Sequence, residues 1–194
     1  MNEQARPAIP VMFFAGPRGA GKSKAILSLL DFKPEIERWT LIVEELGNTM
    51  PDPGLLAKVG VTVRGAPYGC PCCTGNLTMR VSLARAVREL QPDRILIELP
   101  WGAHLAKTLS LLGDPLLAEV VSLWRLVTVI DVGTMAPAIL PAPLREALDL
   151  SDSILLSGTD IRPEQVSDFS NAFSGKQVIV GNKGNPVGKL LEPR

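Results

Sequence analysis

Residues 16–23 read Gly-Pro-Arg-Gly-Ala-Gly-Lys-Ser, which matches the phosphate-binding pattern G-x-x-x-x-G-K-[ST]. Its glycines let successive backbone N–H groups turn inward around a phosphate, and a helix beginning there adds partial positive charge. Lys22 would reach the β- and γ-phosphates of a nucleotide, and the Ser23 hydroxyl would hold Mg²⁺. We therefore expect nucleotide contacts from the loop and its flank rather than a glycine-rich turn with an exposed lysine. The candidate residues are Gly16, Pro17, Arg18, Gly19, Ala20, Gly21, Lys22, Ser23 and Lys24.

An acidic residue, Glu98, follows the apolar run 95–97 at the end of a predicted strand. An acid at this place can orient water on Mg²⁺ or position the attacking water. The alternative is a strand-end carboxylate that caps the following turn. We take Glu98 and Lys22 as the candidate catalytic residues.

All three cysteines of the chain lie within four residues, at Cys70, Cys72 and Cys73. Thiolates favour Zn²⁺, Cu⁺ and comparable ions, and neighbours this close rarely form a relaxed disulfide. Three ligands from one loop leave a fourth position open, which suits a metal that is handed on. The alternative is that the cysteines are small apolar side chains that fill space. The cluster indicates metal or redox chemistry in a reducing compartment, and we expect the protein to be cytoplasmic.

The composition excludes several classes of protein. With 194 residues, 46% of them hydrophobic, the chain is expected to form a single domain over residues 1–194, with residues 181–194 as a frayed tail. Because 20 Lys and Arg balance 20 Asp and Glu, we expect neither nucleic acid nor an anionic membrane as a partner. Residues 1–7 do not read as a secretion signal, and charged residues interrupt the most apolar stretch, so no membrane span is expected.

Short apolar runs alternate with longer amphipathic segments, which predicts an α/β fold with a mainly parallel sheet covered by helices on both faces. The expected strands are Ile9–Ala15, Trp39–Glu44, Val61–Arg64, Arg94–Leu99, Leu126–Ile130, Ser153–Leu156 and Gln177–Val180. The expected helices are Gly21–Leu30, Leu77–Leu90, Ala103–Leu112 and Pro163–Phe173, with loops at 47–54 and 65–75 and an irregular segment at 131–143. In the second helix the apolar stripe is expected at Leu77, Val81, Ala84, Val87 and Leu90.

The loop Gly69-Cys70-Pro71-Cys72-Cys73 lies between the phosphate loop and the acidic strand end. In this order the motifs resemble the CobW-type metal-chaperone GTPases, relatives of the hydrogenase, urease and methylmalonyl-CoA mutase accessory GTPases, over about residues 9 to 180. The family's E-x-G segment and following Asp have counterparts in Glu45-Leu46-Gly47 and Asp52. The resemblance implies a three-layer P-loop NTPase fold, Asp52 beside Ser23 and Glu98 at Mg²⁺, and Glu45 beside the cysteines at a transition metal.

Two positions depart from the family pattern. The usual E-x-x-G reads Glu98-Leu99-Pro100-Trp101 here, with Gly102 one place later, so hydrolysis is expected to be slow or absent. The usual guanine-reading N-K-x-D reads Ser157-Gly158-Thr159-Asp160, which keeps the carboxylate for the guanine edge and loses the lysine stem. The later segment Asn182-Lys183-Gly184-Asn185 is interpreted as a terminal turn, and the chain ends where typical members begin a second domain.

Together these observations predict a weak GTPase that acts as a metallochaperone or metal-site regulator. The expected ligands are GTP, with ATP less favoured, Mg²⁺, and Zn²⁺ or another transition metal; Asp160 would contact the base. The expected partners are a client metalloprotein or cofactor-assembly protein and, with nucleotide, a second copy of the chain. The alternatives are a degenerate nucleotide-binding module without turnover and a small-molecule kinase, although no arginine-rich lid is evident.

Overall fold

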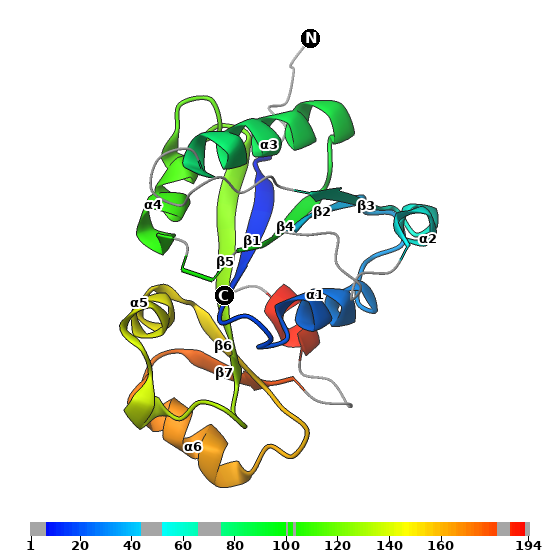
Figure 1. Ribbon diagram of the computed structural model, residues 1–194. Helices are drawn as coiled ribbons and strands as arrows, with labels where there is room; N and C mark the ends of the chain where they lie inside the picture. The colour runs from blue at the N-terminus through cyan, green and yellow to red at the C-terminus, as the bar shows by residue number, and fades with distance from the viewer. Residues whose placement is uncertain are drawn as a thin grey trace.

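One parallel sheet organises the chain (Figure 1). The computed structural model describes residues 7–43, 52–65, 75–99, 101–102, 104–181 and 187–192, with the side chains of residues 75–77 excepted. The sheet has seven strands in the order β3-β2-β4-β1-β5-β6-β7, and every paired strand runs parallel to its neighbour. The strands are β1 (Ile9–Ala15), β2 (Trp39–Val43), β3 (Val61–Gly65), β4 (Arg94–Glu98), β5 (Val121–Asp131), β6 (Ser153–Ser157) and β7 (Gln177–Val180). The predicted α/β class is confirmed.

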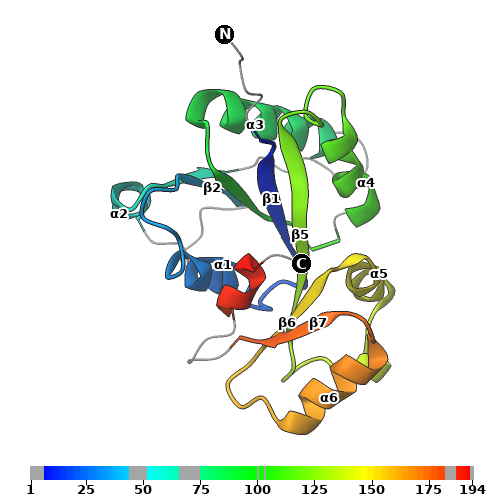
Figure 2. The same cartoon turned by 180° about the vertical axis from the view of Figure 1, so that it is seen from behind.

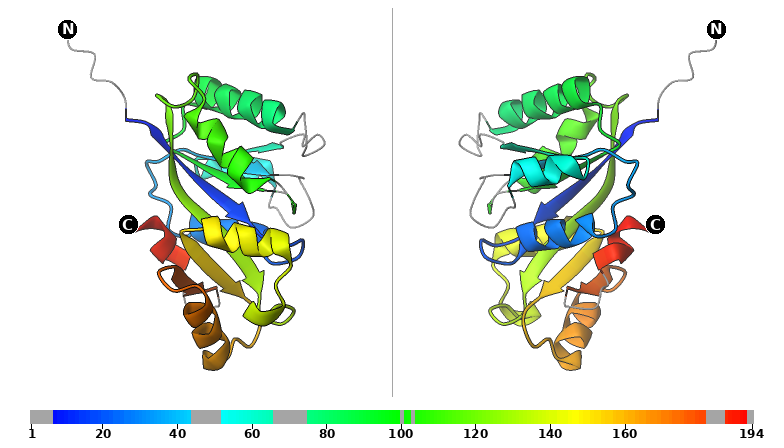
Figure 3. Two further views of the ribbon diagram at one scale, coloured as in Figure 1. Left: turned by 90° about the vertical axis from the view of Figure 1, so that its left-hand side faces the viewer. Right: turned by 90° about the vertical axis from the view of Figure 1, so that its right-hand side faces the viewer.

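Helices cover both faces of the sheet, as Figure 3 shows from opposite sides. One layer holds α3 (Gly75–Leu90), α4 (Leu105–Ser110), α5 (Ala142–Leu150) and α6 (Pro163–Ala172). The other holds α1 (Lys22–Leu30), α2 (Pro53–Lys58) and the 3₁₀ segment η3 (Val187–Leu191). Two further 3₁₀ turns are η1 (Leu111–Gly113) and η2 (Pro137–Ile139). Across the described ranges, no helix has the length and apolar character needed to cross a bilayer.

The central strand β1 is buried on both faces, which explains its continuous apolar sequence. Val11 and Phe13 pack into the layer of α3 and α4, whereas Met12 and Phe14 pack into the layer of α1. Since β1 lies between β4 and β5, its carboxyl end is held from both sides. The loop that follows β1 therefore starts at a well-fixed position.

Helix α3 packs on the sheet through a face that only partly matches the predicted stripe: Val87 and Leu90 pack against the core as predicted, but the most deeply buried positions are others. Its buried side chains are Met79, Leu83 and Ala86, while Val81 is 41% exposed and Ala84 is also exposed. Both stripes have helical spacing, so periodicity alone could not separate them. Met79, Leu83 and Ala86 form the more deeply buried side of the helix.

Three further elements differ from the sequence-based expectations. Strand β5 begins at Val121, five residues before the predicted start. Its first half includes the exposed Ser122 and Leu123 and a register shift against β1 at Val11 and Met12, so it lacks the continuous buried pattern of residues 125–130. Helix α5 was not predicted; Pro141 precedes its first turn. Helix α2 lies partly in a predicted loop, and the Asp52-Pro53 pair at its start is a helix-initiation signal that was overlooked.

The prediction of a frayed end is wrong for residues 187–192. Val187 and Leu190 of η3 are buried against the layer of α1, and the two segments lie side by side in Figure 2. Gly188 fits closely against the Phe32 ring, where an added Cβ would lie 3.1 Å from Cδ1. The buried Arg125 guanidinium donates from Nη2 to the Glu192 carbonyl at 3.1 Å. The segment is thus part of the core.

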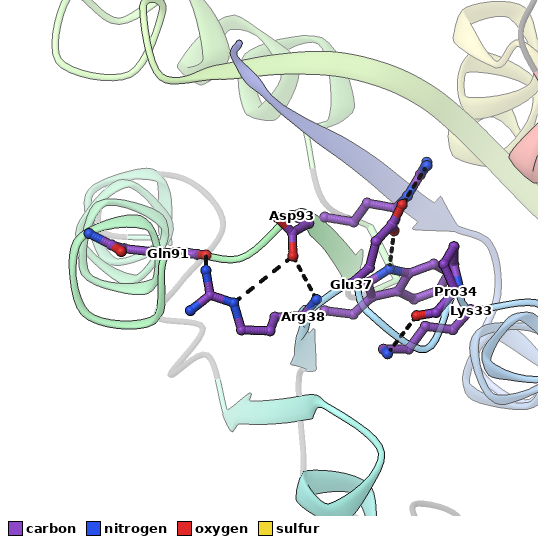
Figure 4. A network of polar contacts seen from close by, with 8 residues as sticks. Lys33, Pro34, Glu37, Arg38, Gln91 and Asp93 are labelled. Atoms are coloured by element: carbon purple, nitrogen blue, oxygen red, sulfur yellow. Dashed lines mark hydrogen bonds and ion pairs between the residues drawn. The ribbon is translucent and has the colours of Figure 1, made fainter. Parts of the chain in front are cut away.

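Polar contacts join the amino ends of β2 and β4, at the edge of the sheet opposite the phosphate loop (Figure 4). Glu37 accepts hydrogen bonds from Trp39 Nε1 at 2.7 Å and Arg94 Nε at 2.8 Å. Burial raises the pKa of Glu37, but the hydrogen bonds from Arg94 and Trp39 outweigh it and lower the pKa below its ordinary value. The Arg38 backbone N–H donates to Asp93 at 2.7 Å. These contacts help to hold β4 in register.

We expect Leu190→Ala to destabilise the protein by about 2–5 kcal/mol, because it leaves a cavity where a fully buried side chain packs on α1. Urea unfolding followed by circular dichroism measures the change. Ile36→Ala is the control, since Ile36 is 93% exposed and its truncation should cost less than ~0.5 kcal/mol. Equal stability of the two variants would show that η3 does not contribute to the core.

Candidate functional site

The predicted phosphate loop connects β1 to α1 at the carboxyl edge of the sheet. Gly16 has φ 137°, and a Cβ at this position would lie 2.3 Å from the Val129 carbonyl oxygen on β5. Gly21 has φ 92° and immediately precedes the first helical residue. Both positions therefore need glycine, one because of close approach and the other because of its left-handed backbone. The predicted order of strand, loop and helix is present.

The loop curls around the Lys22 ammonium group. Lys22 is only 6% exposed, and its Nζ donates to the carbonyls of Gly16 at 3.1 Å and Pro17 at 3.2 Å. These carbonyls satisfy the ammonium hydrogens that would otherwise point at a phosphate. A nucleotide that enters the loop must take over these contacts.

Glu98 reaches the same place from the neighbouring strand. It pairs with Phe14 in the β1–β4 ladder, so its side chain lies next to the start of α1. Ser23 Oγ lies 2.9 Å and 3.1 Å from the two Glu98 carboxylate oxygens, and Lys22 Nζ lies 3.9 Å from Glu98 Oε1. The structure thus brings together Lys22, Ser23 and Glu98, as the sequence predicted.

The chemistry of these groups fits Mg²⁺ held between protein and phosphate. A serine that donates its proton to a carboxylate keeps its oxygen lone pairs for a cation. Mg²⁺ prefers oxygen ligands and keeps several waters, which carboxylates orient. Ser23 would bind the ion directly, with Glu98 beside it, and Lys22 would meet the phosphates.

A third strand supports the loop through Ser157, whose role the sequence analysis missed. Its Oγ lies 2.6 Å from the Ala20 carbonyl oxygen in the loop and 3.1 Å from the Ile130 carbonyl oxygen in β5. The hydroxyl has one proton, which serves the closer Ala20 carbonyl. The sequence does contain a signal for this role: Ser157 is a hydroxyl residue at the end of a strand, and it occupies the first position of the segment that corresponds to N-K-x-D.

The backbone after Ser157 suits glycine at the position of the family's lysine. Gly158 has φ 146°, and a Cβ there would lie 3.3 Å from Val132 Cγ2. A side chain at this position would be strained in the observed backbone. Asp160 follows in an exposed bend at the same edge of the sheet as the loop.

Two candidate Mg²⁺ or nucleotide residues have other surroundings. Asp52 caps α2, where its Oδ1 accepts from the Gly54 N–H at 2.7 Å and the Leu55 N–H at 3.3 Å. This local role accounts for its position, and its contact with Mg²⁺ stays a prediction. Lys24 is exposed in the first turn of α1 and faces away from the core.

The predicted transition-metal site cannot be compared with the structure. Glu45, Cys70, Cys72 and Cys73 all lie outside the described residues. Within the described part of the chain, no group of three or more His, Cys, Asp or Glu side chains is placed to hold a metal ion. The metal assignment therefore rests on the sequence.

A small open cleft lies beside the start of the loop. Gly16, Trp101, Leu105 and Glu146 contribute to its lining, so it lies between α4 and α5. Trp101, at the position of the family's glycine, is 41% exposed there. The departure from E-x-x-G thus places a bulky side chain in the cleft beside the phosphate loop.

Comparisons with known proteins agree with this geometry. Residues 10–179 match the family described as the CobW/HypB/UreG nucleotide-binding domain. The chain belongs to this family. The match to the CobW/HypB/UreG nucleotide-binding domain includes both the P-loop and the acidic end of β4, which meet through Ser23 and Glu98.

A curated relative and two solved structures show the range of similarity. The zinc chaperone YeiR of Escherichia coli (strain K12) is 36% identical over 113 residues, which is 58% of this chain and 34% of YeiR. Chloroplast FtsY from Physcomitrella patens has a TM-score of 0.65 at 18% identity, over 97% of this chain and 62% of that one. HypB from Helicobacter pylori, in complex with nickel, has a TM-score of 0.58 at 16% identity, over 89% and 78%. The two structures show a shared fold.

We expect Ser157→Ala to weaken nucleotide binding roughly three- to tenfold, because the loop loses the hydroxyl that holds the Ala20 carbonyl. Isothermal titration calorimetry with Mg-nucleotide measures the dissociation constant. Ser170→Ala is the matched control, since the Ser170 hydroxyl bonds only to the Val166 carbonyl of its own helix among the contacts described. An affinity equal to that of the control would show that Ser157 does not position the loop.

Proposed function

We propose that this chain binds GTP with Mg²⁺ and uses the nucleotide to control a transition metal for assembly of a metal site. The observation that carries the proposal is the convergence of Lys22, Ser23 and Glu98 at the mouth of the phosphate loop. Family membership and the similarity to a zinc chaperone support the metal part. The match covers only about a third of YeiR, so metal delivery by this chain is part of the proposal.

Different residues of the site contact the phosphates, the Mg²⁺ ion and the base of the nucleotide. Backbone N–H groups of the glycine-rich loop and of the start of α1 would face the phosphates; Pro17 has no N–H, and the Ala20 N–H donates to the Pro17 carbonyl at 3.2 Å. Lys22 exchanges its carbonyl partners for phosphate oxygens, and Ser23 with Glu98 orients the bound Mg²⁺, which supplies charge neutralisation. Asp160 accepts the N–H groups of the guanine edge in charge-assisted hydrogen bonds.

Turnover is proposed to be slow. Glu98 already interacts with Ser23 and Lys22, so it is better placed to orient Mg²⁺ than to remove a proton from water. Trp101 lies where the family has the glycine whose N–H approaches the γ-phosphate, and it lines the adjacent cleft. The same observations favour the second candidate function, a nucleotide-binding module without turnover.

One set of contacts supports coupling between the nucleotide and the cysteine loop. Helix α3 begins two residues after Cys73, and its Arg80 pairs with Asp114 at 2.8 Å. Asp114 follows α4 and η1, the elements that come after the acidic end of β4. A movement of Leu99, Trp101 and Gly102 with nucleotide would therefore be passed to the helix that follows the cysteine loop in the chain. A client metalloprotein or cofactor-assembly protein would receive the metal, in the cytoplasm, and nucleotide would promote a homodimer.

We expect wild-type protein to bind GTP more tightly than ATP, and Asp160→Ala to reduce the affinity for GTP alone. Competition of each nucleotide against a fluorescent GTP analogue measures both affinities. Lys22→Ala is the control that should lose both nucleotides, because Lys22 meets the phosphates rather than the base. Equal displacement by GTP and ATP from the wild type would remove guanine from the proposal.

We expect the chain to bind about one Zn²⁺, with an affinity that changes when a non-hydrolysable GTP analogue is present. Chelator competition with and without the analogue measures this, and Cys72→Ser and Cys73→Ser should each weaken the metal sharply. Because thiols lose protons on binding, the affinity should fall as pH falls. Identical Zn²⁺ affinity in the two nucleotide states would contradict the coupled function.

A further inference from the structure

Arg18 is a charged residue of the phosphate loop whose side chain the contacts above do not use. It lies between Pro17 and Gly19, which has φ 80°, and it is exposed at the tip of the loop. Within the ranges that the structure describes, its guanidinium makes no hydrogen bond or ion pair. By contrast, Lys22 in the same loop is buried and held by backbone carbonyls. Arg18 is thus free to move toward a ligand.

The position of Lys22 shows which part of a nucleotide Arg18 would meet. Lys22 Nζ lies beside the carbonyls of Gly16 and Pro17, the two residues that precede Arg18. A P-loop lysine contacts the β- and γ-phosphates, so the first residues of the loop lie nearest that end of the nucleotide. Arg18 follows them directly. Pro17 also fixes its own φ, which limits the conformations of the loop at this point.

The balance of charge at the site favours such a contact. A nucleoside triphosphate with one Mg²⁺ carries a net charge of about −2, and a diphosphate with Mg²⁺ carries about −1. The positive charge of Lys22 has the Glu98 carboxylate 3.9 Å away, so this pair adds little net charge. Arg18 adds a positive charge that, among the described residues, takes part in no ion pair. Its planar guanidinium matches two phosphate oxygens better than an ammonium group does.

We propose that Arg18 binds the terminal phosphate of the nucleotide in its own loop and makes the site prefer a triphosphate to a diphosphate. The inference rests on the proposed function, because it requires that the loop hold a nucleotide. It adds a residue that distinguishes the two nucleotide states. Loss of the γ-phosphate removes the partner of Arg18 and leaves the Lys22 contacts to the β-phosphate.

The test compares the dissociation constants of a non-hydrolysable GTP analogue and of GDP, by calorimetry at fixed Mg²⁺ and salt. Arg18→Ala should weaken the analogue about ten- to a hundredfold and change GDP binding by less than about threefold. Arg18→Lys should lie between Arg18→Ala and the wild type, because it keeps the charge and loses the planar fork. Arg88→Ala is the matched control: Arg88 is exposed near the end of α3, at the opposite edge of the sheet, and its loss should change neither constant.

Three results would overturn the assignment. An equal loss of affinity for the analogue and for GDP in Arg18→Ala would show that Arg18 shapes the loop. Unchanged affinities for both would show that Arg18 does not touch the γ-phosphate. A triphosphate preference that rises with protein concentration would place the contact between two chains. Failure of the wild type to bind either nucleotide would overturn the proposed function itself, which distinguishes the two claims.

Discussion

The hydrogen bond between Ser23 and Glu98 joins the phosphate loop and α1 to the acidic end of β4, and it depends on how the rest of the sheet is held. Glu98 is the last residue of β4, and Ser23 is the second residue of α1, 75 positions earlier in the chain. Their contact depends on the register that pairs Phe14 with Glu98. A slip of one residue would turn the carboxylate to the other face of the sheet. The buried core around β1 and the polar contacts at the opposite edge both oppose such a slip.

The phosphate loop is held from several directions by backbone as well as side chains. The Val129 carbonyl of β5 allows only glycine at position 16, and the Ser157 hydroxyl of β6 holds the Ala20 carbonyl. Strand β4 contributes Glu98 from the other side. Preorganisation of this kind lowers the cost of ordering the loop when a ligand binds. The order β4-β1-β5-β6 places all of these supports around the carboxyl end of β1.

The sequence predicted what is encoded locally and missed what depends on distant contacts. Strand β1, the P-loop and the start of α1 are specified by adjacent residues, and the structure places them as expected. The stripe of α3 was only partly right and the start of β5 was wrong, because each depends on how the segment meets the sheet. The burial of Leu190 could not be predicted because it requires α1 as a partner. Ser157 was underestimated for the same reason, since its acceptor, Ala20, is 137 positions away.

An anion that binds Lys22 must first displace the two backbone carbonyls that accept its hydrogen bonds, which lowers the affinity for any competing anion. A small ion such as inorganic phosphate or sulfate would have to replace two carbonyl contacts and compete with Glu98, while offering few groups to the rest of the loop. A polyphosphate chain compensates for the same exchange by using many backbone N–H groups at once. A polyphosphate would therefore bind the loop in preference to a single phosphate or sulfate ion. In a cell rich in simple anions, the carbonyl groups and the Glu98 carboxylate around the Lys22 ammonium group would reduce occupation of the phosphate loop by those anions.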